Sequence, residues 1–172
     1  MRLSFFFVFL GLYGHSQTFT LNGNASNLGG GCYRLTSSSS YQVGSAWCQD
    51  ALDLSLPFDL RLDMKFGNSD GGADGLAFVM QGQGLSAIGA VGSSLGYAVN
   101  APADPPANGI IPSLAIEFDT FWDGSGGDPG YDHIAMMRDG VKDHTIPANT
   151  VASPVEALVG GLNIEDGAYH RV

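Results

Sequence analysis

The chain has 172 residues, of which 44% are hydrophobic, and a formal net charge of −10. Its length fits one domain with a core of its own, and its apolar content argues against an intrinsically disordered protein. Its seven Lys and Arg residues are too few for the clustered positive charge that phosphate recognition needs, so a nucleic-acid-binding protein is not expected.

The N-terminus predicts a secretory signal peptide over residues 1–16. Arg2 precedes a short apolar run, Leu3–Leu12, and the small residues Gly14 and Ser16 follow it. The run is shorter than the about 20 apolar residues of a membrane-spanning helix, and the alternative to a signal peptide is a buried first strand. We expect a domain over residues 17–172 that is secreted or held at the cell surface and has no transmembrane segment.

Cys32 and Cys48 are the only cysteines of the chain. A pair of cysteines in an exported protein is more often bridged than free, and these two lie in predicted strands on either side of a Ser-rich turn. The pattern favours a structural role, either as a cross-strand disulfide or as buried thiols.

Apolar and polar residues alternate through Leu56–Phe66, which predicts a half-buried antiparallel strand. No stretch keeps the 3.6-residue period of a helix, and Asp139-Gly140 is a hairpin turn signal. Further strands are expected at Thr18–Leu21, Cys32–Thr36, Val43–Cys48, Gly75–Gln81, Leu95–Val99, Ser113–Asp119, His133–Arg138 and Val155–Val159. Short strands at this spacing are typical of an all-β fold, an antiparallel β-sandwich or barrel. Residues 168–172 read as the opening of a strand, so we expect the C-terminal strands of the domain to be missing.

The segment between Lys65 and Arg138 contains no Lys or Arg but eight acidic residues: Asp70, Asp74, Asp104, Glu117, Asp119, Asp123, Asp128 and Asp132. Carboxylates without counter-charges must be solvated, protonated or bound to metal ions. This excess of negative charge is therefore the first indication of function.

Glu117 and Asp119 share one face of their predicted strand, because side chains two apart in a strand point the same way. The Gly-rich loop after this strand and the start of the next strand add further candidate ligands: Asp123, Asp128, Asp132 and His133. Carboxylate and carbonyl oxygens on a flexible loop suit Ca²⁺, whereas an added imidazole suits Mn²⁺ or Zn²⁺. The alternative is a solvated acidic turn without an ion.

The motif EFDTFWD, followed by DP and DH, resembles the metal-binding signature of the L-type (legume-type) lectins, most closely their bacterial members. The resemblance implies a jelly-roll sandwich of the concanavalin A-like type. It implies a site for Mn²⁺ or another transition metal at Glu117, Asp119, Asp128 and His133. It also implies a Ca²⁺ site at Asp119, the Phe121 carbonyl, Asp123 and Asp128. The family commonly has Asn where this chain has Asp123. An Asp at this position can still ligate calcium, but it changes the local charge.

Two upstream motifs extend the resemblance. The segment Gly71–Gln81 resembles the family's Ala-Asp-Gly-Leu-Ala-Phe strand. In the family, the Asp of this strand follows a cis peptide bond and accepts hydrogen bonds from two sugar hydroxyls. The resemblance implies that Asp74 anchors the sugar. The segment Gly89–Tyr97 is similar to the family's Gly-rich loop, in which an amide donates to the sugar, and Gly92 and Ser93 are the nearest candidates. Phe121 would stack on the C–H face of the sugar, as aromatic rings favour.

The resemblance implies calcium-dependent binding of a carbohydrate or glycoconjugate by a non-enzymatic module, part of a larger cell-surface or adhesive protein with further domains. One alternative is a glycoside hydrolase of the same fold, which needs two carboxyl groups about 5–5.5 Å apart. Phe121 and Trp122 stand where such an enzyme would carry its acid/base Glu, which disfavours hydrolysis. The other alternative is a metal-stabilised structural module that binds no sugar.

Overall fold

The computed structural model describes residues 17–99 and 109–172, and the predicted signal peptide lies outside this part of the chain. The described residues form ten strands and one three-residue 3₁₀ helix, Gly92–Ser94, and every strand pair is antiparallel. The predicted all-β class is therefore confirmed. Within the same residues, no helix has the length and apolar character needed to cross a bilayer.

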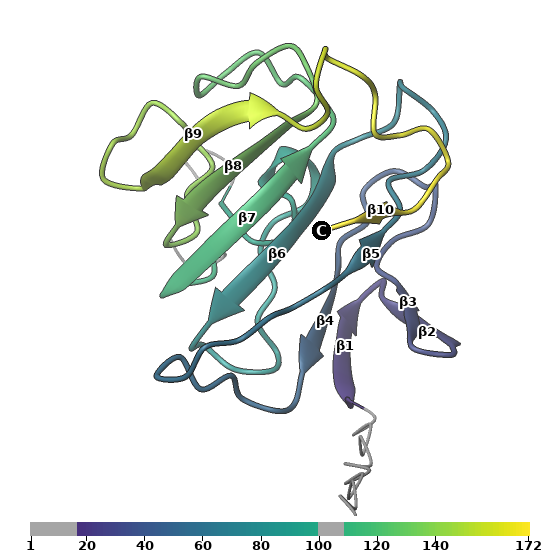
Figure 1. The fold of residues 1–172 in the computed structure, drawn as a ribbon, viewed down its shortest axis with the longest axis vertical. Coiled ribbons are helices and arrows are strands. Elements are labelled where there is room, and N and C mark those ends of the chain that lie inside the picture. Colours follow the sequence, from purple (N-terminus) through teal and green to yellow (C-terminus); the bar gives the residue numbers. More distant parts are fainter. Residues whose placement is uncertain (1–16, 100–108) are drawn as a thin grey trace, which may run out of the picture.

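The largest sheet has four strands in the order β6 (Gly75–Gln81), β7 (Ser113–Asp119), β8 (His133–Arg138) and β9 (Thr150–Glu156). Figure 1 shows these strands side by side as one twisted layer. β6, β7 and β8 have the bounds that the sequence predicts. The strand expected at Val155–Val159 instead begins at Thr150, because its pairing with β8 runs from Met137 to His133 with two register shifts.

Six shorter strands form three pairs: β1 (Phe19–Gly23) with β4 (Gly44–Cys48), β2 (Ser26–Gly29) with β3 (Cys32–Arg34), and β5 (Asp63–Met64) with β10 (His170–Arg171). β1, β3 and β4 lie where the sequence predicts strands. β10 corresponds to the strand opening expected at the end of the chain.

The long strand expected at Leu56–Phe66 is wrong, because only β5 forms there. β5 pairs with β10, and next to this pairing Leu62 and Val172 exchange backbone hydrogen bonds of 3.0 and 3.1 Å. Upstream of this point the apolar face is exposed, with Phe58 at 48%. Alternation creates a face that can be buried, but a strand also needs a backbone hydrogen-bonding partner.

The strand expected at Leu95–Val99 is also wrong. Leu95 takes a left-handed conformation (φ 49°) directly after the 3₁₀ helix, and the backbone there forms turns. The segment is nevertheless buried, with Tyr97 and Ala98 both at 0% exposure. Gly89 permits this close packing, since a Cβ there would overlap the Tyr97 backbone.

The two cysteines are both free thiols, so the predicted disulfide is not formed. Cys32 lies on β3 and Cys48 on β4, and neither strand pairs with the other, so the cross-strand geometry is not available. Cys32 is exposed and Cys48 is half-buried, and the alternative of two buried thiols is therefore wrong for Cys32.

The core lies between one face of the four-stranded sheet and the loop that contains residues 85–99. Its buried members are Ala87, Tyr97, Ala98, Ile110, Ala115 and Met137. Trp47 of β4 packs against them and donates from Nε1 to the Ala87 carbonyl at 2.7 Å. Residues of β7 on this same face continue from Ala115 to Glu117 and Asp119, so the core leads directly into the acidic site.

Candidate functional site

The register of β7 and β8 brings the predicted metal ligands together. Glu117 and Asp119 share a face of β7, and Asp119 pairs with His133, the first residue of β8. All three are buried, with Glu117 and His133 at 1% exposure and Asp119 at 8%. The loop between the strands returns Asp128, whose Oδ1 lies 3.8 Å from His133 Nδ1. These four predicted residues therefore lie at one place.

The arrangement contains two groups whose ligand atoms all lie within 4.8 Å of one another: Glu117, His133 and His144, and Asp119, Asp128 and His133. Three side-chain atoms of these residues, Asp128 Oδ1, His133 Nε2 and His144 Nδ1, are buried without a hydrogen-bond partner. Buried polar atoms are normally paired, so these donor sets fit a divalent metal ion.

The electrostatics of the site also favour a cation. Burial raises the pKa of Asp119 to about 8, and the charges of Asp128, Glu117 and Asp74 add to this rise, although the Phe121 amide that donates to Asp119 opposes it. Burial likewise raises the pKa of Asp128. Burial lowers the pKa of His133, which favours the neutral imidazole that binds metals.

His144 is a member of the site that the sequence reasoning missed. Its Nε2 contacts Glu117 Oε1, and its ring lies 5.2 Å from that of His133 at 86°. Its backbone N–H donates to the Gly126 carbonyl at 2.8 Å, which ties its loop to the acidic loop. Burial alone would lower the pKa of His144, but the hydrogen bond and charge of Glu117 raise it. No spacing rule connects His144 to β7, because the contact depends on how the loop after β8 folds back.

Asp123 lies beside this group but is oriented differently from the expectation. Its N–H donates to Asp128 Oδ2 at 2.6 Å, while its carboxylate accepts from Ser125 and contacts Lys142 Nζ. Although burial opposes it, these partners hold the pKa of Asp123 at about 2. The structure thus pairs Asp123 with Lys142 and does not include it among the grouped metal ligands.

The predicted sugar-contacting residues gather around the same lysine. The Ala73–Asp74 peptide bond is cis, and the Asp74 carbonyl accepts from the Thr120 N–H at 3.0 Å. A Cβ on Gly92 would lie 4.0 Å from Asp74 Oδ2. Lys142 Nζ donates to Ser93 Oγ at 2.7 Å and also contacts Asp123. The structure therefore brings Asp74, Gly92, Ser93 and Asp123 together.

The aromatic residues of the acidic loop are exposed. Phe121 is 45% and Trp122 is 63% exposed, so neither is a core residue. Phe121 is held next to the ligands through its N–H, which donates to Asp119 Oδ1 at 2.9 Å. An exposed ring next to polar groups provides a face on which a sugar could stack.

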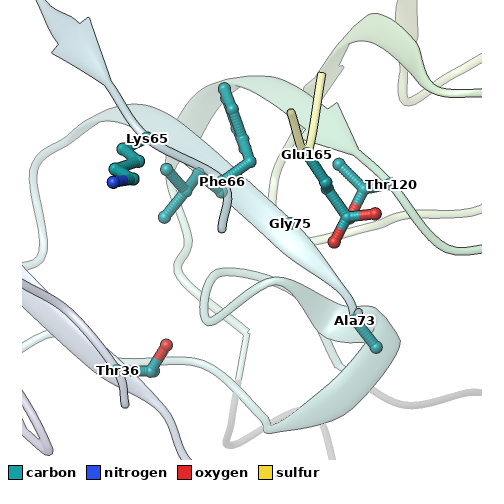
Figure 2. A pocket seen from close by; sticks show the side chains of 8 residues that line it. Thr36, Lys65, Phe66, Ala73, Gly75, Thr120 and Glu165 are labelled. Carbon is teal, nitrogen blue, oxygen red and sulfur yellow. The ribbon is translucent and has the colours of Figure 1, made fainter. Parts of the chain in front are cut away.

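Behind Asp74 lies a small cavity of about 80 Å³, lined by Thr36, Lys65, Phe66, Ala73, Gly75, Leu76, Thr120 and Glu165. Figure 2 shows the Glu165 carboxyl beside Thr120, with the Lys65 ammonium group at a distance from both. Glu165 is 4% exposed, and its Oε2 has no hydrogen-bond partner. Its Oε1 packs on Gly72, where a Cβ would overlap it. Glu165 therefore supports the backbone that leads into Asp74.

A comparison with protein families agrees with this site. A family model described as the legume lectin beta-barrel domain matches residues 14–172, which include every described strand. Domains of this family bind metal ions and carbohydrates, and the buried carboxylate–histidine groups of this chain fit the first of these properties. The chain belongs to the L-type lectin family and is a carbohydrate-binding lectin domain of the all-β class.

Proposed function

We propose that this lectin binds its sugar in a calcium-dependent way at the cluster formed by Asp74, Gly92, Ser93, Phe121 and Asp123. The observation that carries the proposal is the adjacency of this cluster to the buried carboxylates. The Asp74 carbonyl accepts a hydrogen bond from the N–H of Thr120, the residue after Asp119. The Asp123 N–H donates to the carboxylate of Asp128. Neutralising the carboxylates would therefore also order the sugar site.

In this proposal Ca²⁺ is held by oxygen atoms of Asp119, Asp128, Asp123 and the Phe121 carbonyl, because Ca²⁺ prefers carboxylate and carbonyl ligands. Asp123 would exchange its contact with Lys142 for the ion. A transition metal such as Mn²⁺ would occupy the adjoining set of Glu117, Asp119, Asp128 and His133. Each ion would supply the positive charge that these buried carboxylates lack.

The roles of the sugar-contacting residues follow from their chemistry. The Asp74 carboxylate would accept hydrogen bonds from two hydroxyl groups, and the Gly92 or Ser93 amide would donate one. Asp123 would also accept, and the exposed Phe121 ring would stack on the C–H face. A shallow site of this kind binds a single sugar weakly and gains strength from multivalent display. This fits a module that is secreted or held at a cell surface, as the signal-peptide pattern suggests, and that serves adhesion.

The proposal is tested with a glycan array probed in calcium, in EDTA and after calcium is restored. Chelation is expected to abolish binding and calcium to restore it. Asp74→Asn should weaken binding about 10- to 100-fold, because hydrogen bonds to a charged acceptor contribute about 1.5–3 kcal/mol. Asp50→Asn, which changes an exposed carboxylate outside the proposed site, is the matched control.

Three outcomes would contradict parts of the proposal. Unchanged binding in EDTA would remove calcium dependence. Unchanged binding by Asp74→Asn would remove the site. Binding of metal without any glycan would favour the metal-stabilised structural module.

We propose that the domain does not hydrolyse its ligand. Glu117 is 1% exposed, and its two oxygens already contact the Tyr97 hydroxyl and His144. A catalytic carboxylate must instead face the scissile bond. Release of reducing sugar by the wild-type chain that is lost in Glu117→Gln would overturn this conclusion.

A further inference from the structure

We propose that Lys142 contacts the bound ligand and gives the sugar site a preference for acidic saccharides, in which a carboxylate replaces a hydroxymethyl group. The inference rests on the proposed function, because it places the sugar at the cluster that surrounds Asp74. It deepens that function by naming the class of saccharide and by adding a residue to which no sequence motif points.

Lys142 lies in the loop after β8, and its side chain reaches two parts of the proposed site. Its Nζ donates to Ser93 Oγ at 2.7 Å and contacts a carboxylate oxygen of Asp123. Burial raises the pKa of Asp74, and the charge of Lys142 opposes this rise, so the ammonium group also acts on the sugar anchor. Among the residues that the structure describes, no other Lys or Arg contacts Asp74, Ser93 or Asp123.

The backbone on both sides of Lys142 is held in place. The Val141 carbonyl accepts from the Tyr97 hydroxyl at 3.3 Å. The His144 N–H donates to the Gly126 carbonyl at 2.8 Å. The side chain of Lys142 is 20% exposed, so its ammonium group is partly withdrawn from water and still open to a ligand. A group that is fixed before binding loses little conformational entropy when the ligand arrives.

The hydrogen-bond donors of Lys142 define what it can bind. A lysine ammonium group has three N–H donors and no acceptor. Ser93 and Asp123 take two of these donors, which leaves one for a ligand. Once Asp123 ligates Ca²⁺, as proposed above, a second donor and the positive charge also lose their partner. A carboxylate supplies two acceptor oxygens and the opposite charge, whereas a hydroxyl group supplies no charge.

The carboxylates of the cluster recognise a different part of the ligand. When ionised, Asp74 and Asp123 accept hydrogen bonds and donate none, so they bind hydroxyl groups. The ammonium group of Lys142 only donates, so it binds a group that only accepts. A saccharide that carries hydroxyl groups and one carboxylate, such as a hexuronic acid, matches both kinds of side chain.

The experiment uses a glycan array of matched pairs in saturating Ca²⁺. Each pair is a glycoside of glucose, galactose or mannose and the uronic acid made by oxidising its C6 hydroxymethyl group. The wild type should bind at least one uronic acid about tenfold more tightly than its neutral partner, because hydrogen bonds between charged groups are the stronger ones. Lys142→Gln, which keeps a donor and removes the charge, should bind both members of that pair within about twofold. Lys65→Gln is the matched control, since Lys65 is the other lysine of the chain and lies over the Tyr169 ring.

Two results would overturn the proposal: a wild type that prefers no uronic acid over its neutral partner, and a preference that Lys142→Gln retains. Neutral glycans that bind in Ca²⁺ and are released by EDTA, without any acidic preference, would overturn this inference and leave the proposed function supported. An acidic preference that is lost in Lys142→Gln but persists in EDTA would support the role of Lys142 and contradict the calcium dependence.

A second measurement covers the case in which Lys142→Gln does not fold. Lys65 and Lys142 are the only lysines, so ¹³C-labelled lysine gives two Cε signals, which Lys65→Gln assigns. In the calcium-loaded wild type, the uronic acid should shift the Lys142 signal and leave the Lys65 signal unchanged. Its neutral partner should shift the Lys142 signal less. Equal shifts with the two ligands, or no shift at Lys142, would overturn the proposal.

Discussion

Glu165 provides a prediction that is independent of the metal ligands. Its carboxyl group is 4% exposed, lies against the cavity behind Asp74, and has one oxygen without a partner. Burial raises its pKa to about 7, and the nearby Asp132 and Asp70 charges add to the rise, although the Thr120 hydroxyl opposes it. Glu165→Gln keeps the shape of the side chain and removes the charge.

The sign of the effect follows from the two pKa values. Below the ordinary value of 4.5 the carboxyl is protonated in both the folded and the unfolded chain. Between 4.5 and about 7 the unfolded chain ionises first, so folding stability falls as the pH rises. Above about pH 7 the carboxyl is ionised in both states, so its free-energy cost to folding no longer changes with pH. At 1.36 kcal/mol per pH unit the difference corresponds to roughly 3 kcal/mol, of which the variant is expected to recover about 1–3 kcal/mol.

The assay is denaturant unfolding of the wild type and Glu165→Gln at pH 4.5 and at pH 8.5. Saturating metal is present throughout, so that other titrations cancel in the comparison. The variant is expected to be more stable by about 1–3 kcal/mol at pH 8.5 and equally stable, within about 0.5 kcal/mol, at pH 4.5. Glu156→Gln, which removes an exposed carboxylate of β9 away from the cavity, is the control for the loss of one negative charge. A stability difference that does not change with pH would refute the reasoning.

Two further predictions concern single contacts near the site. Tyr97→Phe removes the hydroxyl that donates to a buried carboxylate of β7; unfolding of the metal-free chain should show a loss of about 1–3 kcal/mol, and no loss would mean that the hydroxyl is dispensable. Lys142→Met removes the cation beside Asp123; carboxyl NMR titration without metal should show the pKa of Asp123 rising from about 2 toward 3.8, and an unchanged value would rule out the pairing.

The strands around the site were predictable because their signals are local. Glu117 and Asp119 share a face by the two-residue period of a strand, and the bounds of β6, β7 and β8 follow from apolar runs between turn residues. Once three neighbouring strands are known, an antiparallel register brings a residue at the end of β7 next to His133 at the start of β8.

Other features depended on partners that are distant in the sequence. Leu56–Phe66 has the alternation of a long strand but pairs over β5 alone, and its residues before Leu62 are exposed. Leu95–Val99 is apolar enough for a strand but is buried as turns over the sheet. In both cases, tertiary packing decided which backbone groups found hydrogen-bond partners.

The amino-acid sequence by itself determined the all-β class and the alignment of two carboxylates on one face of β7, because side-chain direction alternates along any strand. Only the tertiary structure decided that His144 contacts Glu117, that Lys142 pairs with Asp123, and that Glu165 supports the Asp74 loop. These contacts join loops far apart along the chain, and their positions depend on how each loop folds back over the sheet. No local period encodes that geometry.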